Sequence, residues 1–532
     1  MDLGVVSVTE QPGPRPAQWR GVLTHSHTYS GKADHGGIQL PPESYQHMAA
    51  WAQRVGAAAV AMGSPWTPKS AALYHRYDEL DRATYYDPAF DKRALVETAD
   101  VADMLAQANS AADGRTVFFL DNETPKARYG HLWWVGWRQD FPAWHDYDQD
   151  FDRWMVHQTK AGEHGDEPMS YTRRPYLQIV AEQRAAGALG FWAHPTSWWT
   201  GDQGQFITNI AAEMPVHAIA DGFLDGLVVM GYHAYRPQYL ALWHDVLDRG
   251  YRCPGVAEMD AGLSDAGLWA KESALLTYMP VDSVSVEAVI KAMRSGRMYS
   301  SSGPHADLQV DGEEMGSVVA TGPGHIHRVT IEAYPATPGA RVCVELLGRG
   351  GQVLWARENF AGGRLELALA GLNTRGYLVA QVFAQEHRHG AWRGVKEFAV
   401  SNPVYLHPPG HGFNQPTRTR VEVAVDAASE FVGGEMRSEN AAGELLHAGR
   451  VATGLTRLEM PASGRVRMIS PAGRVRTDYL VNANAPLRDA LRYLYRGRFL
   501  DDRPELQPGE VPPEVWPWDR IALAMAQVRL AY

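Results

Sequence analysis

The chain has 532 residues, a formal net charge of −11, and ordinary proportions of hydrophobic (45%) and charged (21%) residues. A chain this long needs more than one hydrophobic core, and the acidic balance without a basic block argues against a nucleic-acid partner. No apolar run is long enough to span a membrane and no signal-like segment opens the chain, so we expect no membrane partner and a cytoplasmic location. The two cysteines, Cys253 and Cys343, lie far apart, which excludes a disulfide framework and predicts two buried structural thiols.

Short apolar segments alternate with helical segments between residues 18 and 304. Strands are expected over residues 21–24, 57–62, 116–120, 190–193, 226–230 and 255–258. Helices are expected over residues 44–55, 94–108, 174–186, 239–249 and 286–295. This alternation favours a parallel α/β sheet or barrel, in which functional side chains follow the carboxyl ends of the strands.

The pattern changes after Gly303-Pro304. Residues 305–407 alternate between apolar and polar positions, with regular turn signals, which is typical of a β-sandwich. Residues 408–532 are expected to form a second β-rich domain with terminal helices over 485–495 and 520–530, and residues 1–17 an N-terminal extension. The last domain could cover the site, form a homo-oligomer contact or bind a ligand.

The most informative motif is His25-x-His27, because residues two apart on a strand point to the same face. Further imidazole and carboxylate side chains follow later expected strands. The candidate metal ligands are His25, His27, Glu123, His131, His194 and Asp260. Such donors suit zinc, manganese or iron, so the sequence predicts one or two divalent ions.

This series resembles the PHP (polymerase and histidinol phosphatase) superfamily of metal-dependent hydrolases, in particular the branch that includes carbaryl hydrolase. The matching motifs are residues 21–27, the pair Glu123 and His131, residues 191–195, Asp260, residues 294–304 and residues 398–405. The resemblance covers about residues 18–407. It implies a distorted (β/α)7 barrel with a hydrolytic site at the strand ends, followed by C-terminal β-sandwich domains.

Three family motifs are incomplete in this chain. Ser30-Gly31-Lys32 lacks the aspartate of the second motif, Met62-Gly63-Ser64 lacks a histidine, and Asp260-Ala261-Gly262 lacks the last histidine. In trinuclear family members these residues together hold one metal, so the resemblance implies two ions at most. One ion would take His25, His27, Glu123 and Asp260, and the other would take Glu123, His131 and His194. Asp34 or His35 could partly replace the lost aspartate.

A bound cation lowers the pKa of water, which would supply a hydroxide nucleophile. His233 follows the strand at residues 226–230 and is our candidate proton donor, so catalytic roles fall to His233, Glu123 and Asp260. A structural, hydrogen-bonded histidine is the alternative for His233.

Eight of the 17 tryptophans lie between residues 133 and 199, where core packing and substrate stacking are both open. The substrate-binding candidates are Trp198, Trp199, Tyr232, Tyr235, Arg294 and Lys32. Aromatic residues near a site suit an aromatic ring or a sugar.

Because basic residues are not clustered at the motifs, we favour a metal-dependent hydrolase of an ester, amide or carbamate bond in a small aromatic or sugar-like molecule. A PHP-type phosphoesterase is the alternative, in which Lys126 and Arg128 would clamp the phosphate. A metal-dependent carbohydrate lyase and a degenerate, non-catalytic module with a binding role in the β domains also stay open. An amidohydrolase-type barrel would need a lysine where Glu123 stands.

Overall fold

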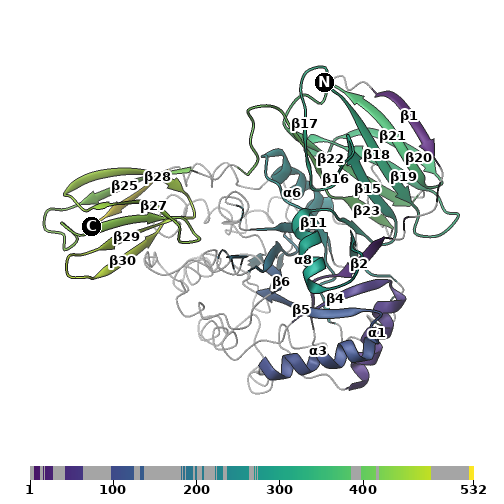
Figure 1. The fold of residues 1–532 in the computed structure, drawn as a ribbon, viewed down its shortest axis with the longest axis horizontal. Coiled ribbons are helices and arrows are strands. Elements are labelled where there is room, and N and C mark those ends of the chain that lie inside the picture. Colours follow the sequence, from purple (N-terminus) through teal and green to yellow (C-terminus); the bar gives the residue numbers. More distant parts are fainter. Residues whose placement is uncertain are drawn as a thin grey trace.

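The protein is described by a computed structural model (Figure 1). The described residues are 5–11, 18–27, 42–63, 98–124, 132–136, 187–195, 198–200, 206–208, 224–231, 237–262, 273–384, 397–414, 418–480 and 527–532, with a few single residues between them. They build three hydrophobic cores, one in the N-terminal α/β part, one in the β-rich part from residue 305 onward and one near the C-terminus.

Every strand that the sequence predicts in the N-terminal part has a counterpart in the structure. These are β2 (Trp19–Leu23), β4 (Ala57–Gly63), β5 (Val117–Thr124), β7 (Leu189–Trp192), β10 (Gly226–Met230) and β11 (Gly255–Ala257). The described helices are α1 (Pro42–Arg54), α3 (Thr98–Ala112), α6 (Pro237–Asp248) and α8 (Val286–Ser295). The helix expected over 174–186 lies mostly outside the described residues.

Helix α8 shows how local sequence sets these boundaries. The Ser285 side chain accepts a hydrogen bond from the backbone N–H of Ala288 and so caps the first turn. Gly296 ends the helix at φ 75°, a left-handed conformation that glycine adopts without steric cost. Val289 and Met293, four residues apart, form its buried face.

The predicted distorted (β/α)7 barrel is wrong. In the part of the chain that the structure describes, strands far outnumber the four helices, and they form several sheets. β6 (Leu132–Val135) lies antiparallel between β5 and β7, and β13 (Leu276–Pro280) lies antiparallel to β2, so a series of parallel βα units is interrupted twice. Antiparallel neighbours need no helical crossover, so the pairs β5–β6, β6–β7 and β2–β13 are not parallel βα units.

The same sheet runs on into the second half of the chain. From β13 it continues through β14 (Tyr299–Ser301), β23 (Phe398–Ser401), β22 (Gly376–Ala384) and β19 (Val342–Leu347) to β20 (Val353–Phe360). β24 (Val404–His407) also pairs with β22, and β17 (Val318–Ala320) pairs with β24. A short 3-10 helix, η3 (Arg349–Gly351), joins β19 to β20. The 15-stranded sheet is therefore shared by both halves.

A second sheet packs with these strands in a sandwich-like arrangement. It contains β1 (Val5–Gln11), β21 (Gly363–Ala370), β18 (Ile326–Tyr334), β15 (His305–Val310) and β16 (Glu313–Glu314), in that spatial order. Buried and half-buried residues alternate along β21, as expected for a strand with one face on a core. Residues 5–11 of the expected N-terminal extension thus form the edge strand of this sheet.

The C-terminal strands gather in a separate group at one end of Figure 1. One sheet contains β28 (Gly454–Pro461), β25 (Arg418–Val425) and β31 (Gln527–Ala531). The other contains β27 (Leu445–Arg450), β26 (Glu435–Glu439), β29 (Arg465–Ile469) and β30 (Val475–Tyr479). The helix predicted over 520–530 is wrong at its end, because Val528 and Leu530 are buried with period two in β31. The helix predicted over 485–495 lies outside the described residues.

Side-chain hydrogen bonds also join the N-terminal α/β part to the β-rich part that begins at residue 305. Asn402 accepts a hydrogen bond from the backbone N–H of Gly255 (2.6 Å) and donates one to its carbonyl oxygen (3.0 Å), at the start of β11. The Tyr405 hydroxyl accepts a hydrogen bond from the backbone N–H of Cys253. Both cysteines are buried and unbridged, as predicted. Among the described residues, no helix has the length and hydropathy needed to cross a membrane.

Candidate metal centre

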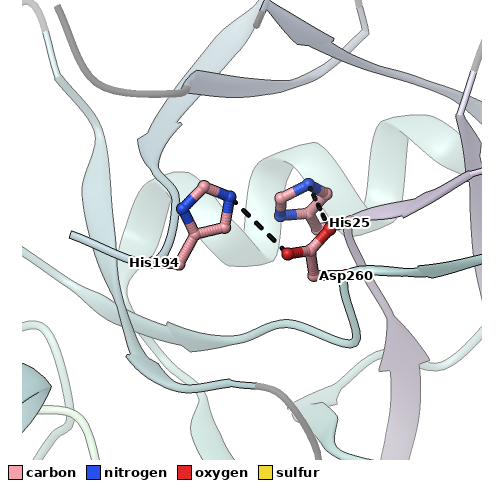
Figure 2. Close-up of side chains that lie close together, drawn as sticks. All are labelled: His25, His194 and Asp260. Carbon is pink, nitrogen blue, oxygen red and sulfur yellow. Dashed lines mark ion pairs between the residues drawn. The ribbon is translucent and has the colours of Figure 1, made fainter. Parts of the chain in front are cut away.

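Three of the predicted ligands meet at one end of the N-terminal sheet (Figure 2). His25 follows β2, His194 follows β7 and Asp260 follows β11. Their ligand atoms all lie within 4.8 Å of one another. The Asp260 carboxylate lies between the rings, with Oδ1 3.6 Å from His25 Nε2 and Oδ2 3.7 Å from His194 Nε2. We call these three residues the His25 cluster.

The chain after β11 reaches the chain after β2 through main-chain hydrogen bonds. β12 (Ala261–Gly262) pairs in parallel with β3 (Ser26–His27), and the Asp260 N–H donates to the His25 carbonyl oxygen at 2.8 Å. The His25 N–H in turn donates to Asp121 Oδ2 on β5 at 2.9 Å. These bonds hold His25 and Asp260 together although they come from distant parts of the sequence.

Neighbouring hydroxyls fix the segment on both sides of His25. Thr24 donates its hydroxyl hydrogen to the carbonyl oxygen of Ala257 at the end of β11. Ser26 donates to the carbonyl oxygen of Ala61 in β4. The backbone around His25 is thereby tied to three different strands, which leaves its ring little freedom to move.

All three cluster residues have a left-handed backbone. The φ angles are 52° for His25, 24° for His194 and 45° for Asp260. This conformation costs a non-glycine residue about 1–3 kcal/mol and persists only where the surroundings enforce it. The shared strain indicates that the end of each strand is bent to aim a side chain into the cluster.

Glu258 is the residue that the sequence failed to identify. Its side chain is fully buried, with Oε2 2.6 Å from His25 Nδ1 and Oε1 accepting the His194 N–H at 3.0 Å. Burial raises the pKa of this carboxyl group, while the adjacent His25 and His194 act in the opposite direction. A charged residue directly after the apolar run of β11, two positions before Asp260, was the available signal.

The donor set fits a divalent metal ion. With His25 Nδ1 engaged by Glu258, the other ring nitrogen, Nε2, faces Asp260 and is the atom available to an ion. A carboxylate on the distal ring nitrogen is the usual way in which proteins orient a metal-binding histidine. Two imidazoles and one carboxylate suit an ion of the zinc, manganese or iron class.

The cluster is enclosed on most sides. His25 and His194 are buried, whereas 15% of the Asp260 side chain is exposed, so solvent reaches the cluster at Asp260. Trp133 lies against His25, with 6.3 Å between ring centroids, and stacks on Phe191 at 4.5 Å. Trp133 is fully buried, which favours the packing role for this tryptophan.

Apart from Arg294, the remaining predicted residues are described by their backbone alone or lie outside the described residues. The backbones of His27 and Glu123 lie in β3 and β5, and those of Trp198 and Trp199 lie in β8 (Trp198–Thr200), which pairs with β9 (Phe206–Thr208). Their side chains are outside the described part. The predicted residues that lie wholly outside it are Lys32, Asp34, His35, Lys126, Arg128, His131, Tyr232, His233 and Tyr235.

Two placements differ from the sequence-based assignment. Arg294, on α8, donates to the carbonyl oxygen of Gly187, which precedes β7, whereas His194 follows β7. The structure therefore does not bring Arg294 to the cluster. It also groups His194 with His25 and Asp260, residues that the sequence assigned to different ions.

Comparison with known proteins adds little. No family model and no curated protein matches the chain. Among solved structures, the major pilin subunit BcpA of Bacillus cereus matches at 10% identity and a TM-score of 0.13, over 44% of this chain and 70% of the pilin. The BSP domain of a biofilm-associated protein matches at 10% identity and a TM-score of 0.13, over 35% of this chain and 30% of that one. Similarity at this level carries no argument about function.

Proposed function

We propose that this protein is a metal-dependent hydrolase acting at the His25 cluster on an ester, amide or carbamate bond of a small aromatic or sugar-like molecule. The observation that carries the proposal is the convergence of His25, His194 and Asp260 from three strand ends, each on a left-handed backbone. The ligand series also resembles that of PHP hydrolases, which supports the same chemistry. We propose membership of that superfamily together with the hydrolase function.

Each residue around the cluster has a defined task in this proposal. His25 and His194 would hold the ion, and Asp260 would supply the carboxylate that lies between their rings. Glu258 keeps the His25 ring oriented through Nδ1 and fixes the backbone of His194. A bound divalent ion would acidify a water molecule and polarise the oxygen of the bond under attack.

Asp260 lies on the side of the cluster from which substrate would enter in this proposal. Its carboxylate is the most exposed of the three side chains, so substrate and water would approach past it. The buried ring of Trp133 excludes water behind His25, which strengthens electrostatic interactions at the cluster. Two buried donors and one accessible carboxylate suit a site that binds and releases a small molecule.

The test combines metal content with a substrate panel. The purified protein, loaded separately with zinc, manganese or iron, is assayed on aryl acetates, aryl carbamates and p-nitrophenyl phosphates. We expect stoichiometric metal and hydrolysis of the uncharged esters or carbamates. Hydrolysis of phosphates alone would replace our substrate class by a phosphoester, and less than about half an equivalent of metal would reject a metalloenzyme.

A further inference from the structure

A second group of ligand-type side chains lies far along the chain, in the β-rich half. Asp311 is in the turn between β15 and β16, His325 directly precedes β18, and His327 is the second residue of β18. Their ligand atoms also lie within 4.8 Å of one another. We call these residues the Asp311 cluster, and it is independent of the His25 cluster and of the proposed hydrolase function.

One carboxylate oxygen is the centre of this group. Asp311 Oδ2 lies 2.7 Å from His327 Nδ1 and 3.2 Å from His325 Nε2. The other oxygen, Oδ1, accepts the backbone N–H of Arg328 at 2.7 Å, and this bond fixes the orientation of the carboxylate. Bonds of about 2.0–2.2 Å to one tetrahedral ion would place its ligand atoms about 3.3–3.6 Å apart, so the 3.2 Å spacing is close to this geometry and the 2.7 Å spacing would widen when an ion binds.

The hydrogen bonds of His327 define which of its nitrogens carries hydrogen. Thr321 donates its single hydroxyl hydrogen to the carbonyl oxygen of Leu372. The same hydroxyl oxygen lies 2.8 Å from His327 Nε2, so it must accept a hydrogen from that nitrogen. In a neutral ring, Nδ1 then presents a lone pair to the Asp311 carboxylate, which is also an acceptor.

The 2.7 Å contact between Nδ1 and the carboxylate requires a positive charge between the two atoms, which is either a second proton on the His327 ring or a bound metal ion. His327 is fully buried, so its Nδ1 cannot turn to solvent to avoid the contact. His325 adds a third donor atom from the exposed side, with 43% of its side chain accessible. A divalent ion at this point would bind all three atoms and supply that positive charge.

We propose that Asp311, His325 and His327 form a binding site for a divalent transition-metal ion of the zinc class. Two imidazoles and one carboxylate are suitable ligands for such an ion, and the exposed side leaves room for water as a further ligand. The ion would join the turn between β15 and β16 to the start of β18. Because the ligands come from a hairpin turn and one strand, the site is built by local structure alone.

The experiment measures zinc binding to the full chain in an Asp260→Ala background, which removes a ligand of the His25 cluster. Metal-stripped D260A protein is titrated with zinc and compared with D260A/H325A. We expect one zinc equivalent in D260A and an affinity at least about 100-fold weaker in the double variant, since even indirect partners of metal ligands affect affinity 10–100-fold. D260A/H447A, which changes an exposed histidine of β27, is the matched control and should bind like D260A.

Two results would overturn the proposal. One is D260A protein that binds no zinc, in which case a proton on His327 accounts for its contact with Asp311. The other is equal zinc affinity in D260A and D260A/H325A. If D260A does not fold, the comparison is made between the wild-type protein and H325A, where the loss of one equivalent is expected and its absence rejects the site. None of these readouts depends on hydrolase activity.

Discussion

The His25 cluster and the Asp311 cluster each contain two histidines and one aspartate, but they differ in how far apart their residues lie in the sequence. The first depends on contacts between distant segments, such as His25 and Glu258, which are 233 residues apart, and its histidines are buried. The second joins Asp311 to His327, only 16 residues away, and His325 is exposed. The first therefore requires the whole sheet to be folded, and the second requires only one hairpin and a neighbouring strand.

The largest expected effect is a loss of hydrolase activity when a ligand of the His25 cluster is removed. His194→Ala removes a ligand of the His25 cluster and should lower kcat/KM by at least about 100-fold, more than changes to residues that only support a ligand. His447→Ala is the matched control and should stay within about twofold, since this exposed histidine lies in β27. Steady-state kinetics on the best substrate of the panel provide the measurement. Equal activity of the two variants would remove the His25 cluster from the mechanism.

A smaller effect is expected when Glu258, the buried residue that contacts His25, is changed. Glu258→Gln replaces the carboxyl group that lies 2.6 Å from His25 Nδ1 by an amide. We expect metal affinity at the His25 cluster to fall by about 10–100-fold, as measured by competition with a chelator. Glu345→Gln changes another buried glutamate, on β19, and should leave this affinity unchanged. A similar loss in both variants would indicate a general effect on folding.

The next prediction concerns the contact between the halves that carry the two clusters. Asn402→Ala removes both hydrogen bonds to Gly255 at the start of β11, and the buried backbone groups would lose their partners. The free energy of unfolding should fall by about 1–3 kcal/mol. Asn373→Ala, at an exposed position, should change it by less than about 0.5 kcal/mol in the same urea titration. Equal stability of the two variants would contradict the importance of this contact.

The last prediction is a pH dependence of stability that belongs to the β-rich half. Burial raises the pKa of Asp307 to about 7, and Glu332, its partner across β15 and β18, adds to the increase. The folded protein therefore holds this proton more tightly than the unfolded chain, so stability is highest below about pH 4 for this group and falls as the pH rises to about 7. The slope is at most about 1.4 kcal/mol per pH unit.

Asp307→Asn should remove this component. Urea midpoints at pH 5 and pH 8 should differ less in the variant than in the wild-type protein. The difference between the two proteins isolates Asp307 from histidines that titrate in the same range. An identical pH dependence would show that the Asp307 carboxyl is ionised throughout. The measurement also gives the baseline against which any stabilisation by zinc at the Asp311 cluster is judged.

Sequence patterns predicted the positions of strands better than their partners. Each apolar run from β2 to β11 was recognised, and His25, His194 and Asp260 were expected near one another because they follow such runs. The direction of pairing was not recognisable, since Leu132-Trp133-Trp134-Val135 has no alternation that marks an antiparallel strand. Because this strand and the antiparallel β13 were missed, a mixed sheet was expected to be a barrel of parallel βα units.

The residues missed around the sites have physical reasons too. Glu258 supports a ligand without resembling one in a motif, and only its burial beside His25 reveals its role. His325-x-His327 has the same spacing as His25-x-His27, but its third ligand is in a hairpin turn and follows no parallel strand. A search restricted to the ends of parallel strands therefore overlooks it.

The pairing of β14 with β23 has a practical consequence for dividing this protein. A fragment cut after residue 304 would keep β14 but lose β23, which bonds to it at Tyr299, Ser300 and Ser301. The exposed hydrogen-bonding groups of such an edge invite pairing with other chains, so the fragment should aggregate even if its own core were intact. The boundary seen in the sequence at Gly303-Pro304 is a change of pattern, and residues on both sides of it should fold and unfold in one cooperative transition.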